Sequence, residues 1–281
     1  MRMKKSCRKA ALGILVFLMN STALAVEFQS ARTQALGGAG RGGPWLTDSI
    51  YLNPSFGSYQ PIYALTSAYT SYQGGRNYNI SVQDSRAEFL QAGAGFTKRE
   101  QNSAVNFGAS RVFAKTLGIG LGSKILIDHP SDKMTSDFIL STSYIALPWA
   151  YASLVVDNLL QGSEQKARNL YRTAYLGLKM IPTKKVEFFV DPFFSPDYAK
   201  GKKAGYQAGA ELGVMNDFFL RFGKYQDAEV PHLNDRGSGF SYGFGWVGPK
   251  LSLDYSTQRT LSTHSGGGIN TAHTGSLSVF F

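Results

Sequence analysis

Cysteine, histidine and long apolar runs are scarce in this sequence, and each scarcity excludes a class of protein. The 281 residues include one cysteine, Cys7, and the four histidines are His129, His232, His264 and His273. Histidines this far apart lack the spacing of metal ligands, so we expect neither a metal nor another cofactor. After residue 25, no apolar stretch comes near the roughly 18 residues that a transmembrane helix needs. The sequence therefore predicts no helical membrane span.

The N-terminus has the three parts of a secretory signal peptide. Basic residues begin the chain, the apolar run Ala10–Leu18 follows, and the small-x-small site Ala23-Leu24-Ala25 completes it. We therefore expect residues 1–25 to be a signal that is cleaved after Ala25. Cys7 lies inside this signal, so the exported chain would contain no cysteine. That excludes the small scaffolds that disulfides hold together.

The net charge of +10 overstates the basicity of the exported chain. Five of the 29 Lys and Arg residues fall in the signal, so 24 basic residues remain against 19 acidic ones, a net charge of +5. These charges are spread over turns and loops and form no basic stripe, which argues against a nucleic-acid partner. Outer-membrane lipid and lipopolysaccharide are better partner candidates.

Short segments that alternate apolar residues with small or polar ones fill the chain from residue 63 onward. The clearest case is residues 117–128. The odd-numbered positions include the apolar residues Leu117, Ile119, Leu121, Ile125 and Ile127, and the even-numbered positions include Gly118, Gly120, Gly122, Lys124 and Asp128. A period of two is typical of a strand with one apolar face. A soluble sandwich or barrel would alternate as well, so the connections between segments have to decide.

Fourteen segments can be placed. When the joins between them are numbered along the chain, the odd-numbered and even-numbered joins differ in length. Even-numbered joins are short, as at Lys115 and Asn216-Asp217, whereas odd-numbered joins are longer and more polar, as at 161–168 and 227–238. Outer-membrane barrels have this asymmetry because short periplasmic turns alternate with longer extracellular loops. We therefore expect an all-β, antiparallel transmembrane β-barrel over residues 63–281, with about 14 strands, in the range of about 12 to 16. The segments are 63–73, 76–85, 88–98, 103–114, 116–128, 135–147, 150–158, 169–181, 186–195, 204–215, 218–226, 239–247, 251–259 and 271–281.

The last segment resembles the C-terminal sorting signal of outer-membrane proteins. Phe281 ends the chain, Val279 and Leu277 share its parity, and Ser278 and Ser276 lie on the other. Together with the signal peptide, this predicts the outer membrane of a Gram-negative bacterium as the location and the outer-membrane assembly machinery as a partner. Tyr and Trp residues near strand ends are expected to anchor the barrel at the membrane interfaces.

Residues 26–62 do not alternate and are predicted to form a separate segment. They contain the turn Ala35-Leu36-Gly37-Gly38-Ala39-Gly40 and, later, Asn53-Pro54. Here the sequence resembles the FadL and PorV-like superfamily of outer-membrane barrels, in which an ALGGAG-like turn precedes an acidic-small stretch that ends in Asn-Pro-Ala. Ser55 replaces the usual Ala.

The resemblance implies a fourteen-stranded barrel, which agrees with the segment count. It also implies that residues 26–62, with Gly37, Gly38, Gly40, Asn53 and Pro54, form a hatch inside the barrel, as in the fatty-acid transport members. Other members are scaffolds for secretion systems. This chain is shorter than the transport members and lacks their large extracellular insertions. Gly38, Gly40 and Gly43 also satisfy the dinucleotide fingerprint G-x-G-x-x-G, but neither the strand before it nor the helix after it is expected.

The charged residues that we place on the inward face are Lys124, Glu211, Arg221 and Asp254. They are candidates for lining the lumen and binding ligand, and they could equally be paired with one another or with the N-terminal segment. Many inward residues are Gly, Ser or Ala, too small to fill a barrel of about fourteen strands. Water, the N-terminal segment or lipid must therefore occupy the lumen.

Three functions are compatible with this sequence. The first is a non-enzymatic, porin-like barrel that passes or holds small, hydrophobic or lipidic molecules. The second is a structural barrel that forms a homo-oligomer or a complex with secretion partners and engages lipid. The third is an outer-membrane phospholipase, because His129-Pro130-Ser131 matches its His-x-Ser arrangement, although the intervening proline favours an ordinary loop.

Overall fold

The computed structural model describes residues 28–73, 75–129, 131–167, 170–197, 203–230, 235–262 and 270–281. The predicted signal peptide with Cys7 lies outside the described residues, as do Pro130, His232 and His264. No helix in the described part is long and apolar enough to cross a membrane.

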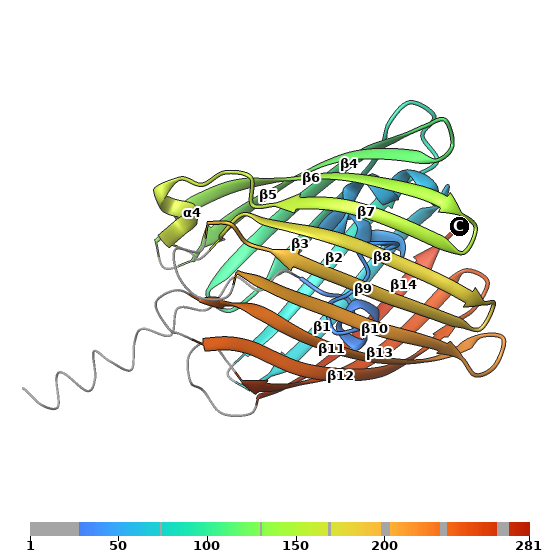
Figure 1. Cartoon of the computed structure of the whole chain (residues 1–281). Coiled ribbons are helices and arrows are strands. Elements are labelled where there is room, and N and C mark those ends of the chain that lie inside the picture. The colour runs from blue at the N-terminus through green and yellow to red at the C-terminus, as the bar shows by residue number, and fades with distance from the viewer. Residues whose placement is uncertain are drawn as a thin grey trace, which may run out of the picture.

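Fourteen antiparallel strands form a closed barrel (Figure 1). Each strand pairs with its neighbours in sequence, and the last strand pairs with the first, which closes the sheet. The predicted fold class and strand number are confirmed. The strands are β1 (Tyr63–Tyr72), β2 (Gly75–Asp84), β3 (Gln91–Lys98), β4 (Asn102–Phe113), β5 (Leu117–Asp128), β6 (Met134–Leu147), β7 (Ala150–Asp157), β8 (Thr173–Thr183), β9 (Val186–Phe194), β10 (Ala204–Gly213), β11 (Phe218–Val230), β12 (Asp235–Val247), β13 (Leu251–Ser262) and β14 (Asn270–Phe280).

The two faces of the sheet have opposite character. Along β5, Ile119 and Leu121 are 46% and 54% exposed on the outer face, whereas Lys124 on the inner face is 5% exposed. Apolar side chains on the outside and small or polar ones inside are what a barrel in a lipid bilayer requires, since lipid-facing and lumen-facing residues alternate along each strand. The predicted parity of this strand is therefore correct.

Several strand boundaries differ from the prediction. β3 begins at Gln91 and not at residue 88, so the join after β2 spans 85–90 and is longer than the predicted Arg86-Ala87 turn. The prediction of a loop over 227–238 was wrong for most of these residues. β11 extends to Val230 and β12 begins at Asp235, and the two strands continue to pair beyond a bulge. Polar composition suggested a loop there, but extending an existing hairpin satisfies the backbone just as well. We call the end of the barrel where β1 begins the short-turn end and the opposite end the long-loop end.

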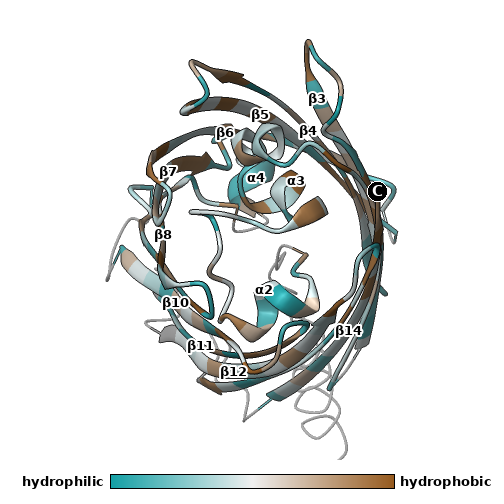
Figure 2. Ribbon diagram, turned by 90° about the vertical axis from the view of Figure 1, so that its right-hand side faces the viewer, coloured by the Kyte–Doolittle hydropathy of each residue, from teal (hydrophilic) through white to brown (hydrophobic). Residues whose placement is uncertain are grey.

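Residues 28–62 lie inside the barrel, and we call them the luminal segment (Figure 2). Its short elements are α2 (Ala31–Ala35), the 3-10 helix η1 (Leu46–Asp48), α3 (Ser49–Leu52) and the 3-10 helix η2 (Pro54–Tyr59). α2 contacts β11 to β14, and η2 contacts β3 to β6, so the segment reaches both sides of the lumen. One further helix, α4 (Ser163–Ala167), lies in the join between β7 and β8.

Candidate functional site

The luminal segment rests on small inward-facing residues of the wall. A Cβ added to Gly177 of β8 would lie 2.5 Å from the backbone nitrogen of Gly42, and one added to Gly209 of β10 would lie 2.7 Å from the carbonyl oxygen of Leu36. On the segment side, Gly37 has φ +71°, a conformation that favours glycine, and a Cβ there would meet the backbone of Lys224 at 2.7 Å. The sequence left the filling of the lumen open, and along these strands the segment fills it.

Asn53 is the centre of a buried hydrogen-bond cluster between the segment and β6 and β7. Its side-chain nitrogen donates to the carbonyl oxygen of Arg41 at 2.7 Å, to the hydroxyl of Ser143 at 2.9 Å and to that of Ser153 at 3.1 Å. Ser55 adds hydrogen bonds to the Asn53 side-chain oxygen at 2.7 Å and to the Ser143 hydroxyl at 2.6 Å. The Asn-Pro-Ser sequence therefore fixes one end of the segment to the wall.

Arg32 of α2 joins a second, charged cluster on the opposite side of the lumen. Its guanidinium donates two hydrogen bonds to Glu211 of β10, at 2.9 and 3.0 Å. Glu211 also accepts a hydrogen bond from Arg221 of β11, which in turn donates to Asp254 of β13. All four residues are buried, with exposures of 2% to 8%. Bidentate arginine–carboxylate pairs of this kind are strong and directional.

Two more residues complete this charged cluster. Glu187 of β9 accepts from Arg32 at 3.4 Å and pairs with Lys179 of β8 at 2.9 Å. The cluster therefore contains three basic and three acidic groups while the segment is docked. Three of the four predicted luminal charges, Glu211, Arg221 and Asp254, belong to it. Sequence reasoning missed Glu187, although it alternates with the apolar residues of its segment as those three do.

Asp191 of β9 holds the glycine-rich turn of the segment. Its carboxylate accepts the backbone N–H groups of Gly40 and Arg41, both at 2.9 Å. The Arg41 guanidinium lies 3.6 Å from the centre of the Tyr175 ring, a cation–π contact. Gly40 has φ +143°, which lets the two amides point at one oxygen. Gly40, one of the three glycines that match the dinucleotide fingerprint, therefore binds a carboxylate of the protein itself.

Asp48 is a buried carboxylate within the segment. It accepts hydrogen bonds from the hydroxyls of Ser30 at 2.6 Å and Thr33 at 2.7 Å. Burial raises the pKa of Asp48 to about 6, because removal from water disfavours the charged form more than the two hydroxyls and the nearby Arg32 stabilise it. The packing of the segment is thereby linked to pH.

The remaining predicted residues lie elsewhere. Lys124 of β5 is inward and buried, as expected, but it pairs with Asp157 of β7 at 2.6 Å, away from the charged cluster. His129 has its Nε2 2.9 Å from the hydroxyl of Ser103, so its hydrogen-bonded serine is on β4 and is not Ser131. Among the described residues, no three His, Cys, Asp or Glu side chains are grouped as metal ligands would be.

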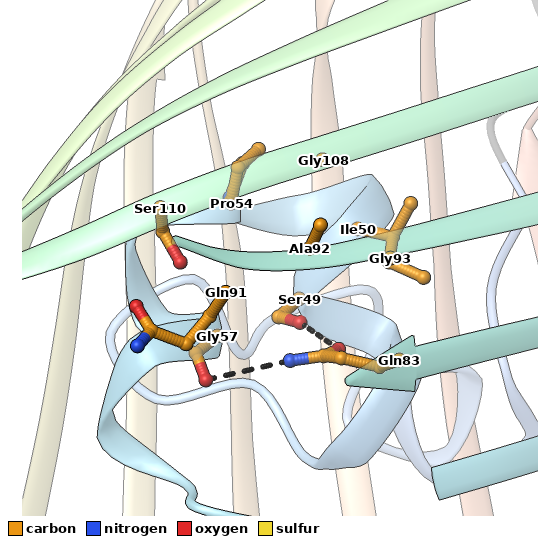
Figure 3. Close-up of a pocket in the computed structure, with 10 residues that line it drawn as sticks. All are labelled: Ser49, Ile50, Pro54, Gly57, Gln83, Gln91, Ala92, Gly93, Gly108 and Ser110. Atoms are coloured by element: carbon orange, nitrogen blue, oxygen red, sulfur yellow. Dashed lines mark hydrogen bonds between the residues drawn. The ribbon is translucent and has the colours of Figure 1, made fainter. Parts of the chain in front are cut away.

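A small pocket lies between the segment and the wall at the short strand β3 (Figure 3). One side is formed by α3 and η2, and the other by β2, β3 and β4. Gln83 bridges the two sides by accepting from the Ser49 hydroxyl at 2.5 Å and donating to the Gly57 carbonyl oxygen at 3.5 Å. The cavity of about 10 Å³ holds about one water molecule. The lining residues are Ser49, Ile50, Pro54, Gly57, Gln83, Gln91, Ala92, Gly93, Gly108 and Ser110.

No protein-family model and no curated protein matches this sequence. Solved structures do match. A FadL homologue from Pseudomonas aeruginosa superposes with a TM-score of 0.67 at 10% identity, covering 91% of this chain and 98% of that one. The barrel is FadL-like. The toluene transporter TbuX from Ralstonia pickettii matches with a TM-score of 0.61 at 10% identity over 92% of this chain and 98% of its own. TodX, the Pseudomonas putida toluene transporter, matches with a TM-score of 0.61 at 10% identity over 91% of this chain and 98% of its own.

These matches confirm the fold that the resemblance implied. At such low identity the likeness concerns the fold alone, so residue roles in this FadL-like barrel have to come from its own contacts. The charged cluster and the Asn53 cluster are the two places where those contacts tie the luminal segment to the wall.

Proposed function

We propose that this protein is an outer-membrane channel for small hydrophobic molecules, and that the luminal segment is a hatch that must move for passage. The single observation that supports the hatch most strongly is the attachment of one segment to opposite sides of the lumen, through Arg32 and through Asn53. The hydrophobic class of the substrate is supported by the solved neighbours, which are a FadL homologue and toluene transporters.

The docked segment corresponds to a closed state. The pocket beside β3 has room for about one water molecule, which is far less than an aromatic hydrocarbon needs. Passage along this side of the lumen therefore requires the segment to leave its place. The polar character of its contacts makes this possible, because water can solvate ion pairs and hydroxyls that separate, whereas a dry apolar core would resist opening.

Undocking of Arg32 changes the charge of the lumen. With Arg32 in place, the charged cluster has equal numbers of basic and acidic groups. Without Arg32, the wall has two basic groups, Arg221 and Lys179, and three carboxylates, so its net charge is negative. The wall charges remain paired with one another, so the barrel itself does not depend on the segment. An opened barrel should therefore prefer cations over anions.

The decisive experiment compares the wild type with Arg32→Met. Losing one partner of a buried ion pair costs about 3–5 kcal/mol, so the segment should undock far more often. We expect planar-bilayer recordings to show larger and more frequent cation-selective openings than the wild type. In whole cells, uptake of the hydrophobic dye N-phenyl-1-naphthylamine should rise as well.

The matched control is Arg172→Met. It removes an arginine paired with Asp197 at 3.1 Å in an exposed position away from the segment, so both readouts should stay at the wild-type level. The proposal is wrong if Arg32→Met and wild-type protein are equally silent in bilayers and equally impermeable to dye.

The alternative function is a scaffold barrel that forms a homo-oligomer or binds a secretion partner. Native mass spectrometry from mild detergent separates the two functions. A channel with its own hatch needs only one chain, whereas a scaffold should retain further copies or other proteins. A defined oligomer combined with an absence of conductance would favour the scaffold.

A further inference from the structure

Basic side chains interrupt the apolar outer surface on one side of the barrel. Lys224 of β11, Arg259 of β13 and Arg76 of β2 all face outward and are exposed, and His273 of β14 lies between the last two. On the opposite wall, the outward residues Ile125 and Ile127 of β5 remain apolar toward the long-loop end. The basic residues therefore form a local feature, which we call the basic arc.

The strand register places the members of the basic arc close together. Lys224 pairs with Phe240 of β12, and Phe240 pairs with Arg259, so the two cations are two strands apart, about 10 Å. His273 pairs with Ser71 of β1, which pairs with Arg76. Side chains as long as lysine and arginine can bridge such distances to a common ligand.

The outward side chains that the structure describes near the arc include no carboxylate. On the described outer faces of β11 to β14, β1 and β2, the outward acid is Asp84, and it lies at the short-turn end while the arc lies toward the long-loop end. On the inward face of the same strands, Arg221 is paired with Asp254 and also with Glu211 of the neighbouring β10. These inward charges therefore have partners of opposite sign, whereas the arc has no acidic partner among the described outward side chains of these strands.

Aromatic residues border the arc on the side of the short turns. Tyr242 is 49% exposed and Tyr255 38% exposed, and the Tyr255 hydroxyl is hydrogen-bonded to Nδ1 of His273 at 2.8 Å. Tyrosine gathers where a barrel meets the head-group layer, because its ring is apolar and its hydroxyl is polar. The arc therefore begins where the apolar band ends, at the depth of lipid head groups.

We propose that the basic arc binds the head group of an outer-leaflet lipid that carries two phosphates. A cation on the lipid-facing side of a barrel is costly near the bilayer centre and much less so at the interface, where an anionic group can pair with it. Lysine supplies a point charge and arginine a planar pair of donors, both suited to phosphate oxygens. The spacing of Lys224 and Arg259 fits two phosphates better than one.

This inference rests on the proposed outer-membrane location but not on transport. The test is lipid titration by native mass spectrometry of the full-length protein in mild detergent, with diphosphoryl lipid A as the probe. Each cation near an anionic head group contributes roughly a fivefold effect on affinity, so Lys224→Gln with Arg259→Gln should weaken binding about 25-fold. Monophosphoryl lipid A should bind the wild type more weakly than the diphosphoryl form.

The matched control removes two lysines from the short-turn end. Lys184 and Lys250 are exposed, and Lys184→Gln with Lys250→Gln lowers the net charge by the same amount, so its affinity should equal that of the wild type. Equal affinity of all three proteins, or undiminished binding of a phosphate-free lipid such as diacylglycerol, would overturn the proposal. Dye uptake by the Lys224 and Arg259 variant should be unchanged, which separates a failure of the lipid site from a failure of the channel.

Discussion

Asn53 shows how single polar residues hold the luminal segment in place. Its side chain is fully buried, and its three donor contacts join the Arg41 carbonyl to two serines of the wall. A buried polar group that loses its partner costs more than the hydrogen bond was worth, because it has already been removed from water. Polar contacts of this kind specify one docked arrangement.

Replacing Asn53 with alanine should loosen the segment without unfolding the barrel. The change leaves the Arg41 carbonyl without its side-chain donor and removes one partner from each of two serine hydroxyls, at a cost of about 1–3 kcal/mol. Limited proteolysis should cut within residues 28–62 sooner than in the wild type, while the barrel keeps its heat-resistant mobility on a gel. Asn77→Ala on β2, outside this cluster, is the control and should behave as the wild type.

Asp48 makes docking dependent on pH. Its pKa is raised from 3.8 to about 6, so the docked state binds a proton more tightly than the undocked state. The resulting stabilisation is fully present below about pH 4 and is lost as the pH rises through about 6, a change on the order of 3 kcal/mol. Proteolysis of the segment should accelerate between pH 4 and 7 in the wild type. If Asp48→Asn showed the same acceleration of proteolysis with pH as the wild type, Asp48 would not be the group that links docking to pH.

The elements of the segment are too short to be stable by themselves. α2 has five residues and α3 has four, well below the length at which an isolated helix persists. Their structure is therefore imposed by the wall, whose glycines let the two backbones approach closely. Figure 2 shows the result, with helices inside the ring of strands.

Filling one of these close approaches should expel the segment. A methyl group at Gly177 would lie 2.5 Å from the Gly42 nitrogen, so Gly177→Ala should raise conductance in planar bilayers. Gly275 faces outward with nothing within 4 Å of an added Cβ, and Gly275→Ala should leave conductance unchanged. If both variants conducted alike, the glycines would not be docking positions.

Local patterns explain how much of these elements the sequence could predict. The parity of Leu117 and Gly118 can be recognised within a few residues, so the faces of β5 and the number of strands were correct. The ends of β11 and β12 were not, because a polar hairpin extension has the composition of a loop. Strand pairing overrides composition where the backbone can continue its ladder.

At the scale of the whole molecule, the barrel and its contents are joined by contacts that no local pattern contains. Arg32 and Glu211 are 179 positions apart, and Arg32 stands in a stretch without alternation. Sequence reasoning found Glu211, Arg221 and Asp254 because they are charged and inward, but it could not tell which partner each would choose. Asp191 was missed, although it shares the inward parity of β9 with Glu187.

The proposed channel depends on movement of the luminal segment, and a reversible lock tests this directly. The Ser55 and Ser143 hydroxyls are 2.6 Å apart, so Ser55→Cys with Ser143→Cys, made in a Cys7→Ser background, should form a disulfide between segment and wall. The control is Ser143→Cys with Ser153→Cys, whose hydroxyls are 2.9 Å apart and both on the wall.

Dye uptake by cells that contain each protein is the measurement. We predict that the oxidised Ser55–Ser143 lock abolishes uptake, that reduction restores it, and that the Ser143–Ser153 control passes dye in both states. Full uptake through the oxidised lock would show that molecules cross without moving the segment, and would contradict the hatch.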